Sequence, residues 1–237
     1  MIRILKISGL IIILAFVYTC KKSENPPSSD GQTGTVTDIE GNIYNTVTIG
    51  TQTWMAENLK TTKYNDGTTI PNVTDWTAWA ALTTPSYCWY NNDATTYKAT
   101  YGALYNWYTV NSTSNGGKNV CPTSWHVPTD AEWTTLTTYL GGESVAGGKL
   151  KETGTAHYWI SPNIGATNET GFTALPGGYR YYSGAYSSIG SYGLWWSSTE
   201  TSSTSAWGRH MHYAYSDVLR TNFNKPSGFS VRCSRDF

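Results

Sequence analysis

Aromatic side chains that could bind a ligand are concentrated between residues 177 and 196. This stretch has the sequence GGYRYYSGAYSSIGSYGLWW, in which aromatic residues alternate with glycine and serine. The negative face of an aromatic ring attracts the slightly positive C–H face of a sugar ring, and Tyr, Ser and Gly form low-entropy contact surfaces in antibody loops. We therefore predict a ligand-binding surface here, with seven candidate residues: Tyr179, Tyr181, Tyr182, Tyr186, Tyr192, Trp195 and Trp196.

The same rings have a simpler interpretation, in which they belong to the hydrophobic core. Successive side chains of a strand point to opposite faces of its sheet. Trp195 and Trp196 therefore cannot both face the solvent if they lie on one strand. An aromatic-rich loop is a default hypothesis for a site rather than a specific motif, so both interpretations stay open from the sequence alone.

Two groups of residues could hold a metal ion. His210 and His212 are two positions apart, so they share a face if they lie on a strand, but a zinc site needs further ligands. Residues 91–93 (Asn-Asn-Asp) and 65–67 (Asn-Asp-Gly) supply the oxygen atoms that calcium prefers, although such runs are typical of turns. We predict a solvent-facing histidine pair, no metal site and no cofactor, with a structural calcium ion as the alternative.

Motifs of common enzyme classes are missing from the sequence. It contains no Gly-x-Ser-x-Gly elbow, no His-Glu-x-x-His motif and no phosphate-binding loop. Its carboxylates have no motif spacing either, and we expect Glu200 to pair inside a sheet with Arg209, Arg220 or Arg232. The sequence therefore favours a protein that is not an enzyme.

The N-terminal sequence has the order of an export signal. Arg3 and Lys6 flank the start of an apolar run at residues 7–17, which is shorter than the roughly 20 residues of a membrane-spanning helix. The junction Val-Tyr-Thr-Cys at residues 17–20 resembles the cleavage site of a bacterial lipoprotein. We predict a signal peptide at residues 1–19 and a lipid anchor on Cys20, with an ordinary signal peptide or an uncleaved anchor as the alternative.

The segment after Cys20 is polar and has no large aliphatic side chain up to residue 35. Such a segment cannot bury enough apolar surface to fold, so we predict a flexible tether at residues 20–35. The remainder, residues 36–237, is within the size range of one large domain. The predicted location is the cell envelope, as an outer-membrane lipoprotein exposed at the cell surface.

The composition argues against nucleic-acid binding and suits an exported protein rich in strands. Charged residues make up 14% of the chain and the formal net charge is zero, whereas binding to a phosphate backbone needs a basic patch. The 11 Trp and 18 Tyr residues, with abundant Thr, Ser and Gly, are typical of strands and loops. Beside Cys20 the chain has Cys88, Cys121 and Cys233, so one of these three thiols stays unpaired if a disulfide forms.

Local patterns predict two helices. Residues 101–110 carry apolar side chains at positions i, i+3 and i+4, which indicates an amphipathic helix. Thr129 and Glu132 form a capping box that starts a second helix, and the glycines at residues 141–142 end it.

Strand patterns dominate the rest of the chain. Residues 35–58 alternate as strands around a two-residue hairpin at residues 50–51. Short helices followed by many strands indicate a single α+β domain. Further strands are predicted at residues 194–199, 206–215, 218–222 and 229–233.

Several stretches, taken together, resemble one family. They include DIEGNIYNTVTIGTQTWMAENLKTTKYNDG at residues 38–67, YCWYNND at 87–93, YGALYNWY at 101–108, CPTSWHVPTDAEW at 121–133, GGKLKE at 147–152, ALPGGYR at 174–180, WWSSTE at 195–200 and GFSVRC at 228–233. In this order they are similar to the Fibrobacter succinogenes major paralogous domain, which is common in surface proteins of Fibrobacter and Bacteroidetes. The resemblance extends from about residue 36 to residue 233.

That family is in turn similar to the C-type lectin-like fold, which includes the formylglycine-generating sulfatase-modifying enzymes. The resemblance implies twisted antiparallel sheets, two or three short helices and long loops. It also implies that the last strand returns near the helix that Thr129 starts, and therefore a disulfide between Cys121 and Cys233. Cys88 would then be a buried small hydrophobic residue.

We therefore expect a lipid-anchored, non-catalytic module at the cell surface that recognises glycans or another surface molecule. Its partners would be the membrane, through the lipid, and a polysaccharide or surface protein, with no nucleic acid. The alternative is a structural or protein-interaction component of the cell envelope. A third hypothesis, an activity like that of the sulfatase-modifying enzymes, would need a free thiol of low pKa at Cys88 or Cys233.

Overall fold

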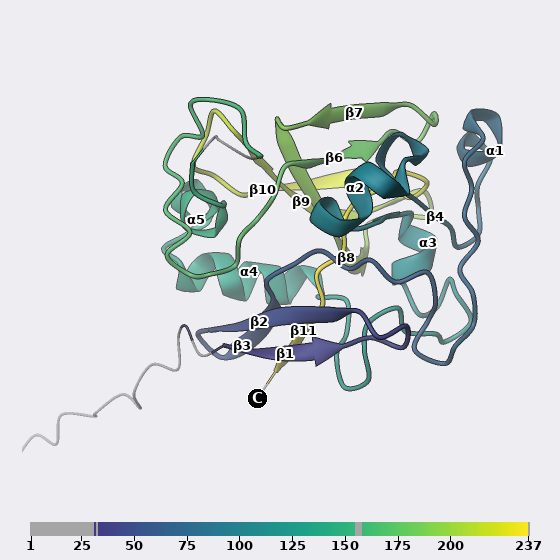
Figure 1. The fold of residues 1–237 in the computed structure, drawn as a ribbon, viewed down its shortest axis with the longest axis horizontal. Helices are drawn as coiled ribbons and strands as arrows, with labels where there is room; N and C mark the ends of the chain where they lie inside the picture. The colour runs from purple at the N-terminus through teal and green to yellow at the C-terminus, as the bar shows by residue number, and fades with distance from the viewer. Residues whose placement is uncertain (1–30, 32, 155–157, 237) are drawn as a thin grey trace, which may run out of the picture.

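The computed structural model describes residues 31, 33–154 and 158–236, whose arrangement is shown in Figure 1. The predicted signal peptide, Cys20 and most of the predicted tether lie outside these residues. The first strand begins at Thr33, slightly before the predicted domain boundary at residue 36. Within the described part of the chain, no helix combines the length and the apolar character needed to cross a membrane.

Two sheets and a short ribbon contain the strands, and the larger sheet lies above the smaller one in Figure 1. The smaller sheet has the order β1-β2-β3-β11 and comprises β1 (Thr33–Thr37), β2 (Ile43–Ile49), β3 (Gln52–Met55) and β11 (Ser234–Asp236). The larger sheet has the order β10-β9-β8-β6-β7 and comprises β6 (Gly177–Arg180), β7 (Tyr186–Ile189), β8 (Tyr192–Glu200), β9 (Ser205–His212) and β10 (Leu219–Asn224). The ribbon pairs β4 (Tyr87–Cys88) with β5 (Leu104–Tyr105).

The helices are short and more numerous than the two or three that were predicted. The described residues form α1 (Trp76–Ala80), α2 (Ala94–Tyr101), α3 (Trp107–Val110), α4 (Asp130–Tyr139), α5 (Glu143–Leu150) and a 3-10 turn, η1 (Tyr90–Asn92). Helices combined with largely antiparallel sheets confirm the predicted α+β class.

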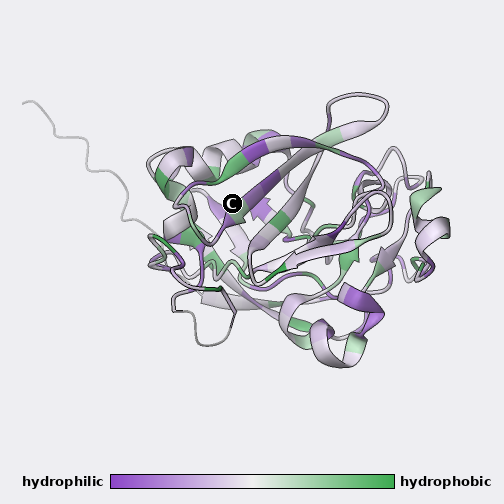
Figure 2. Cartoon of the chain, turned by 90° about the horizontal axis from the view of Figure 1, so that it is seen from above, coloured by the Kyte–Doolittle hydropathy of each residue, from purple (hydrophilic) through white to green (hydrophobic). Residues whose placement is uncertain are grey.

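Helix α4 begins and ends as its sequence predicts. Thr129 and Glu132 form the capping box, each accepting a hydrogen bond from the backbone amide of the other, and Gly141 ends the helix with a φ of 101°. The helix packs between the two sheets, because the Trp133 ring lies 4.8 Å from Trp54 of β3 and 6.5 Å from Trp195 of β8. Figure 2 shows hydrophobic and hydrophilic residues interspersed along the strands rather than separated into blocks.

The single helix predicted at residues 101–110 is confirmed only at its ends, where Tyr101 closes α2 and residues 107–110 form α3, because a glycine breaks the chain between them. Gly102 has a φ of 73°, and a Cβ at this position would lie 2.5 Å from the carbonyl oxygen of Leu59. Helix α2 therefore ends at Tyr101, and Leu104 starts β5 instead of continuing the helical stripe.

The disulfide that the resemblance implied is confirmed. Cys121 and Cys233 are joined across a sequence separation of 112 residues, which links the approach to α4 with the start of β11. A crosslink that closes a loop of this length stabilises a protein by about 4 to 5 kcal/mol in the chain-entropy model. Cys88 is a free and buried cysteine, as predicted.

The strand predicted at residues 229–233 is wrong. Phe229 and Ser230 make only isolated bridges, to Tyr105 and Trp195 respectively, and β11 begins at Ser234. This segment is instead pinned by the buried Arg232, which donates hydrogen bonds to the carbonyl oxygens of residues 172 and 173.

Candidate functional site

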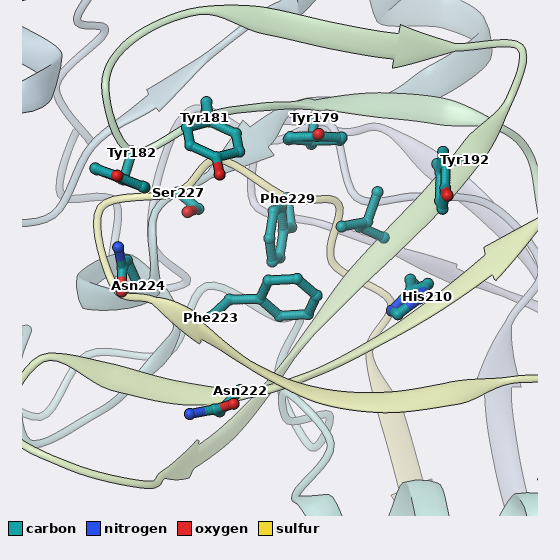
Figure 3. Close-up of a pocket in the computed structure, with 11 residues that line it drawn as sticks. Tyr179, Tyr181, Tyr182, Tyr192, His210, Asn222, Phe223, Asn224, Ser227 and Phe229 are labelled. Atoms are coloured by element: carbon teal, nitrogen blue, oxygen red, sulfur yellow. The ribbon is translucent and has the colours of Figure 1, made fainter.

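A groove with a volume of about 430 Å³ opens on one face of the five-stranded sheet. Figure 3 shows a row of tyrosine rings along one wall and two phenylalanine rings facing them. The wall comes from β6, the turn after it and the start of β8, and the opposite side comes from β9, β10 and the segment after β10. The lining residues are Tyr179, Tyr181, Tyr182, Tyr192, Leu194, His210, Asn222, Phe223, Asn224, Ser227 and Phe229.

The tyrosine wall is held by an arginine on the other side of its strand. Tyr179 and Tyr181 line the groove, and Arg180 between them points away, as alternation along a strand requires. Arg180 is 1% exposed, donates hydrogen bonds to the carbonyl oxygens of residues 73–75, and lies 4.3 Å from the ring centroid of Trp79. Arg180 therefore positions the wall by tying it to a segment about a hundred residues earlier in the chain.

A glycine lets the hairpin of β6 and β7 close beneath the wall. Gly178 has a φ of 62°, and a Cβ there would lie 2.6 Å from the carbonyl oxygen of Ser187 and 2.8 Å from the Tyr90 ring. No other residue fits this position without moving the strand. The glycine pair that precedes Tyr179 is thus part of how the wall is built.

The floor of the groove is a stack of aromatic rings. Phe229 lies parallel to the buried Trp196 with ring centroids 4.3 Å apart, and Phe223 meets Phe229 edge to face at 4.8 Å. Gly208 makes room for this arrangement, since a Cβ there would approach the Phe223 ring to 3.0 Å. Stacked and edge-to-face rings add stability beyond the area that they bury, so the floor is rigid.

The predicted histidine pair lies beside Tyr192, and His210 lines this end of the groove. His210 and His212 share a face, as predicted, with their rings 6.0 and 4.3 Å from the Tyr192 ring. Both side chains are partly exposed, and His210 lines the open groove. Burial lowers the pKa of His210 below its ordinary value, while Asp217 opposes this shift and His212 adds to it. In the described residues, no three His, Cys, Asp or Glu side chains gather in a way that could hold a metal ion.

The groove offers neutral hydrogen-bonding groups beside its ring faces. In the described part of the chain, no hydrogen bond uses the hydroxyl group of Tyr179, Tyr181, Tyr182 or Tyr192. None of the described residues that line it is an aspartate, glutamate, lysine or arginine. An apolar floor with a few convergent polar groups is the usual form of a small-molecule binding site.

Four of the seven predicted binding residues line this groove and three do not. Trp195 and Trp196 are wrong as candidates, because both are 0% exposed and strand β8 is covered on both faces at these positions. Tyr186 lies on the other side of the hairpin, where its ring centroid is 5.4 Å from Tyr90 and its hydroxyl donates to Asn92.

Most of the remaining lining residues were not predicted. The floor is formed by Leu194, Phe223 and Phe229, and the polar end by Asn224 and Ser227. Phe223 lies just beyond the strand predicted at residues 218–222, and Phe229 lies in the GFSVRC motif. The only sequence signal that could have identified them as binding residues is an apolar side chain in or next to a strand-like run.

The oxygen-rich runs considered for calcium serve as turns and caps. Asp66 accepts hydrogen bonds from the Thr68 amide and from Lys118, and Asp93 accepts one from the Thr96 amide at the start of α2. A structural calcium ion stays a prediction, and it would have to compete with these contacts.

Two further groups have residue types that occur in catalysis, but their geometry differs from that of an active site. His126 Nε2 lies 2.5 Å from Glu132 and 3.4 Å from Ser234, whereas the two partners of a catalytic histidine use different ring nitrogens. Burial raises the pKa of the Cys88 thiol to about 11, and Cys233 is in the disulfide. Neither cysteine meets the condition of a free thiol of low pKa.

The pairing expected for Glu200 is wrong. Its carboxylate lies 2.6 Å from the ammonium group of Lys225, because the arginines of the sheet are engaged elsewhere. Asp130 accepts hydrogen bonds from both Arg209 and Arg220, and Arg232 is directed to backbone carbonyls.

Comparison with known proteins shows the family to which the chain belongs. No curated protein and no solved structure matches the chain. The family model of the Fibrobacter succinogenes major domain matches residues 47–235. This range includes α4, the disulfide, the groove and the whole five-stranded sheet, and it leaves out β1 and the first part of β2. The chain is therefore a member of the Fibrobacter succinogenes major domain family.

Proposed function

We propose that this domain binds glycans in the groove on its five-stranded sheet and performs no covalent chemistry. The observation that carries this proposal is the tyrosine wall, whose ring faces and unused hydroxyl groups stand over a rigid aromatic floor. Sugars match such a surface because their C–H faces pack on rings and their hydroxyl groups exchange hydrogen bonds with neutral partners.

We also propose that the domain works at the cell surface as a lipoprotein of the outer membrane. The support is the order of charges, apolar run and Cys20 at the N-terminus. Within this proposal the polar segment that follows holds the groove away from the membrane. The resemblance of the family to the C-type lectin-like fold supports the same reading of the domain as a recognition module.

A glycan array tests the proposal. The full-length protein, solubilised in a detergent that carries no sugar headgroup, is applied to plant, microbial and host glycans. Binding to at least one class is expected, with loss of signal when Tyr181 and Tyr182 are both replaced by alanine. Tyr139→Ala is the control, because this tyrosine is similarly exposed but lies on α4.

If the protein bound no glycan on the array, the glycan-binding proposal would be refuted. If the protein were silent but co-purified from the envelope with a specific protein, the structural or protein-interaction role would replace it. Acylation of Cys20 is tested separately, by mass spectrometry of the protein isolated from membranes. An unmodified cysteine would contradict the proposed lipid anchor and would leave the proposal for the groove unaffected.

A further inference from the structure

A second hollow lies next to the groove. It has a volume of about 320 Å³ and shares two lining residues with the groove, Tyr182 and Asn224. Its other lining residues include Leu82, Tyr108 and Pro226, from the segments after α1, in α3 and after β10. Tyr182 and Asn224 border both hollows, so the two hollows are adjacent and a ligand long enough to pass Tyr182 could contact both.

Among the residues that the structure describes, neither hollow is lined by an aspartate, glutamate, lysine or arginine. Lys225 follows Asn224 in the chain, but it is 5% exposed and its ammonium group is bound to Glu200 at 2.6 Å and to the Ser203 carbonyl oxygen at 2.9 Å. A charged ligand would lose hydration here without gaining an ionic partner. An uncharged ligand avoids this cost.

We propose that the two hollows together bind several consecutive sugar units of an uncharged linear polysaccharide, an inference that rests on the proposed glycan-binding function. The groove supplies the tyrosine wall and the phenylalanine floor, and the second hollow supplies a further ring, Tyr108. The amide of Asn224 at the junction can bond a sugar hydroxyl on either side. A single sugar would occupy only part of this surface, and an acidic chain would find no cation along it.

Titration calorimetry with chains of different length tests the inference. The full-length protein is titrated with neutral linear oligosaccharides of glucose, xylose or mannose, from one to six units, and with an oligogalacturonate of six units as the charged probe. For at least one neutral series, affinity is expected to rise by about tenfold or more between two and six units. The oligogalacturonate is expected to bind at least about tenfold more weakly than the best neutral chain of equal length.

Two variants test whether the rise in affinity between two and six units comes from the second hollow. Tyr108→Ala removes its ring, and Ala81→Trp fills it from an exposed position at the end of α1. Each is expected to lower the affinity for six units towards the affinity for two, whereas Tyr139→Ala keeps the full gain. Circular dichroism confirms folding of each variant.

The outcomes separate this inference from the function on which it rests. Equal affinities for two and six units, or a full gain in both the Tyr108→Ala and the Ala81→Trp variants, would overturn the inference while glycan binding stands. An oligogalacturonate that binds as tightly as the neutral chain would overturn the assignment to uncharged chains. Absence of binding to every sugar would remove the proposed function and the inference together.

Discussion

The two faces of the five-stranded sheet differ in where they place charge. The face covered by α4 contains Arg209, whose side chain is 0% exposed and lies 2.6 Å from Asp130. Arg220 of the neighbouring strand adds a second ion pair to the same carboxylate at 2.8 Å. The open face, which forms the groove, has rings and neutral polar groups instead.

The difference shows that charge does not mark the exposed side of this sheet. The charges of the covered face are paired, because a buried ion without a partner is costly. On the open face, the hydroxyl groups of the tyrosine wall make no hydrogen bond to the described residues. An unpaired hydroxyl group costs little free energy only where water or a ligand can reach it. The paired charges that stabilise the fold therefore lie on the covered face, and the proposed recognition takes place on the open face.

The largest effect is expected on stability, when Asp130, the carboxylate that Arg209 and Arg220 share on the covered face, is removed. Asp130→Ala leaves the guanidinium of Arg209 buried without an anion, which should lower the free energy of unfolding by about 3 to 5 kcal/mol. Urea denaturation measures this, and glycan affinity of the folded variant should not change. Glu169→Ala is the control, since its pair with Lys149 is exposed and should contribute about 0 to 1 kcal/mol. Equal losses in the two variants would contradict the contrast.

A phenylalanine from each side of the sheet gives the next test. Phe223→Ala removes a half-buried ring from the groove floor, so we expect a loss of about 1 to 3 kcal/mol in stability and about tenfold in glycan affinity. Phe172→Ala removes a fully buried ring that packs against Trp133 of α4. It should cost more stability, about 3 to 5 kcal/mol, and leave the affinity of folded protein unchanged. Loss of affinity in the Phe172 variant alone would reverse the assignment of the faces.

Features specified by neighbouring residues could be predicted from the sequence. The capping box of α4 and the glycines that end it lie within 14 residues, and the hairpin of β2 and β3 turns at Gly50. The helix expected at residues 101–110 is interrupted, and only residues 107–110 continue as α3, because its course depends on a distant group. Gly102 packs against the backbone of Leu59, a contact that no local pattern contains.

The groove shows the same division between local and distant determinants. The tyrosines of residues 179–182 were found because their composition is unusual over a short stretch. The floor was missed because Phe223 and Phe229 come from another strand and from the segment after it. Arg180 was missed because its carbonyl partners lie at residues 73–75. Trp195 and Trp196 were misassigned because the sequence does not show that both faces of β8 are covered.

A smaller effect is expected when single rings of the wall are changed. Tyr182→Ala should lower glycan affinity by about fivefold, corresponding to about 1 kcal/mol, and should change stability by less than about 0.5 kcal/mol because this tyrosine is 43% exposed. Tyr182→Phe keeps the ring and should lose less affinity than the alanine variant. If the two variants lost the same affinity, the hydroxyl group rather than the ring face would carry the contact, and the wall would not act as a stacking surface.

The smallest effect is expected from the pH dependence of the open face. Burial lowers the pKa of His210 in the folded state, so the unfolded chain takes up a proton first as the pH falls below about 6.5. The stability of the folded state should therefore be full above this value and decline as the pH falls towards the lowered pKa of the folded state. His210→Gln removes this proton uptake, so the difference in unfolding free energy between pH 7.5 and pH 5 should shrink. His212, whose pKa is also lowered by burial, retains part of the dependence. If the difference were unchanged in the variant, His210 would have the same pKa in the folded and unfolded states. The open face would then not contribute to acid sensitivity.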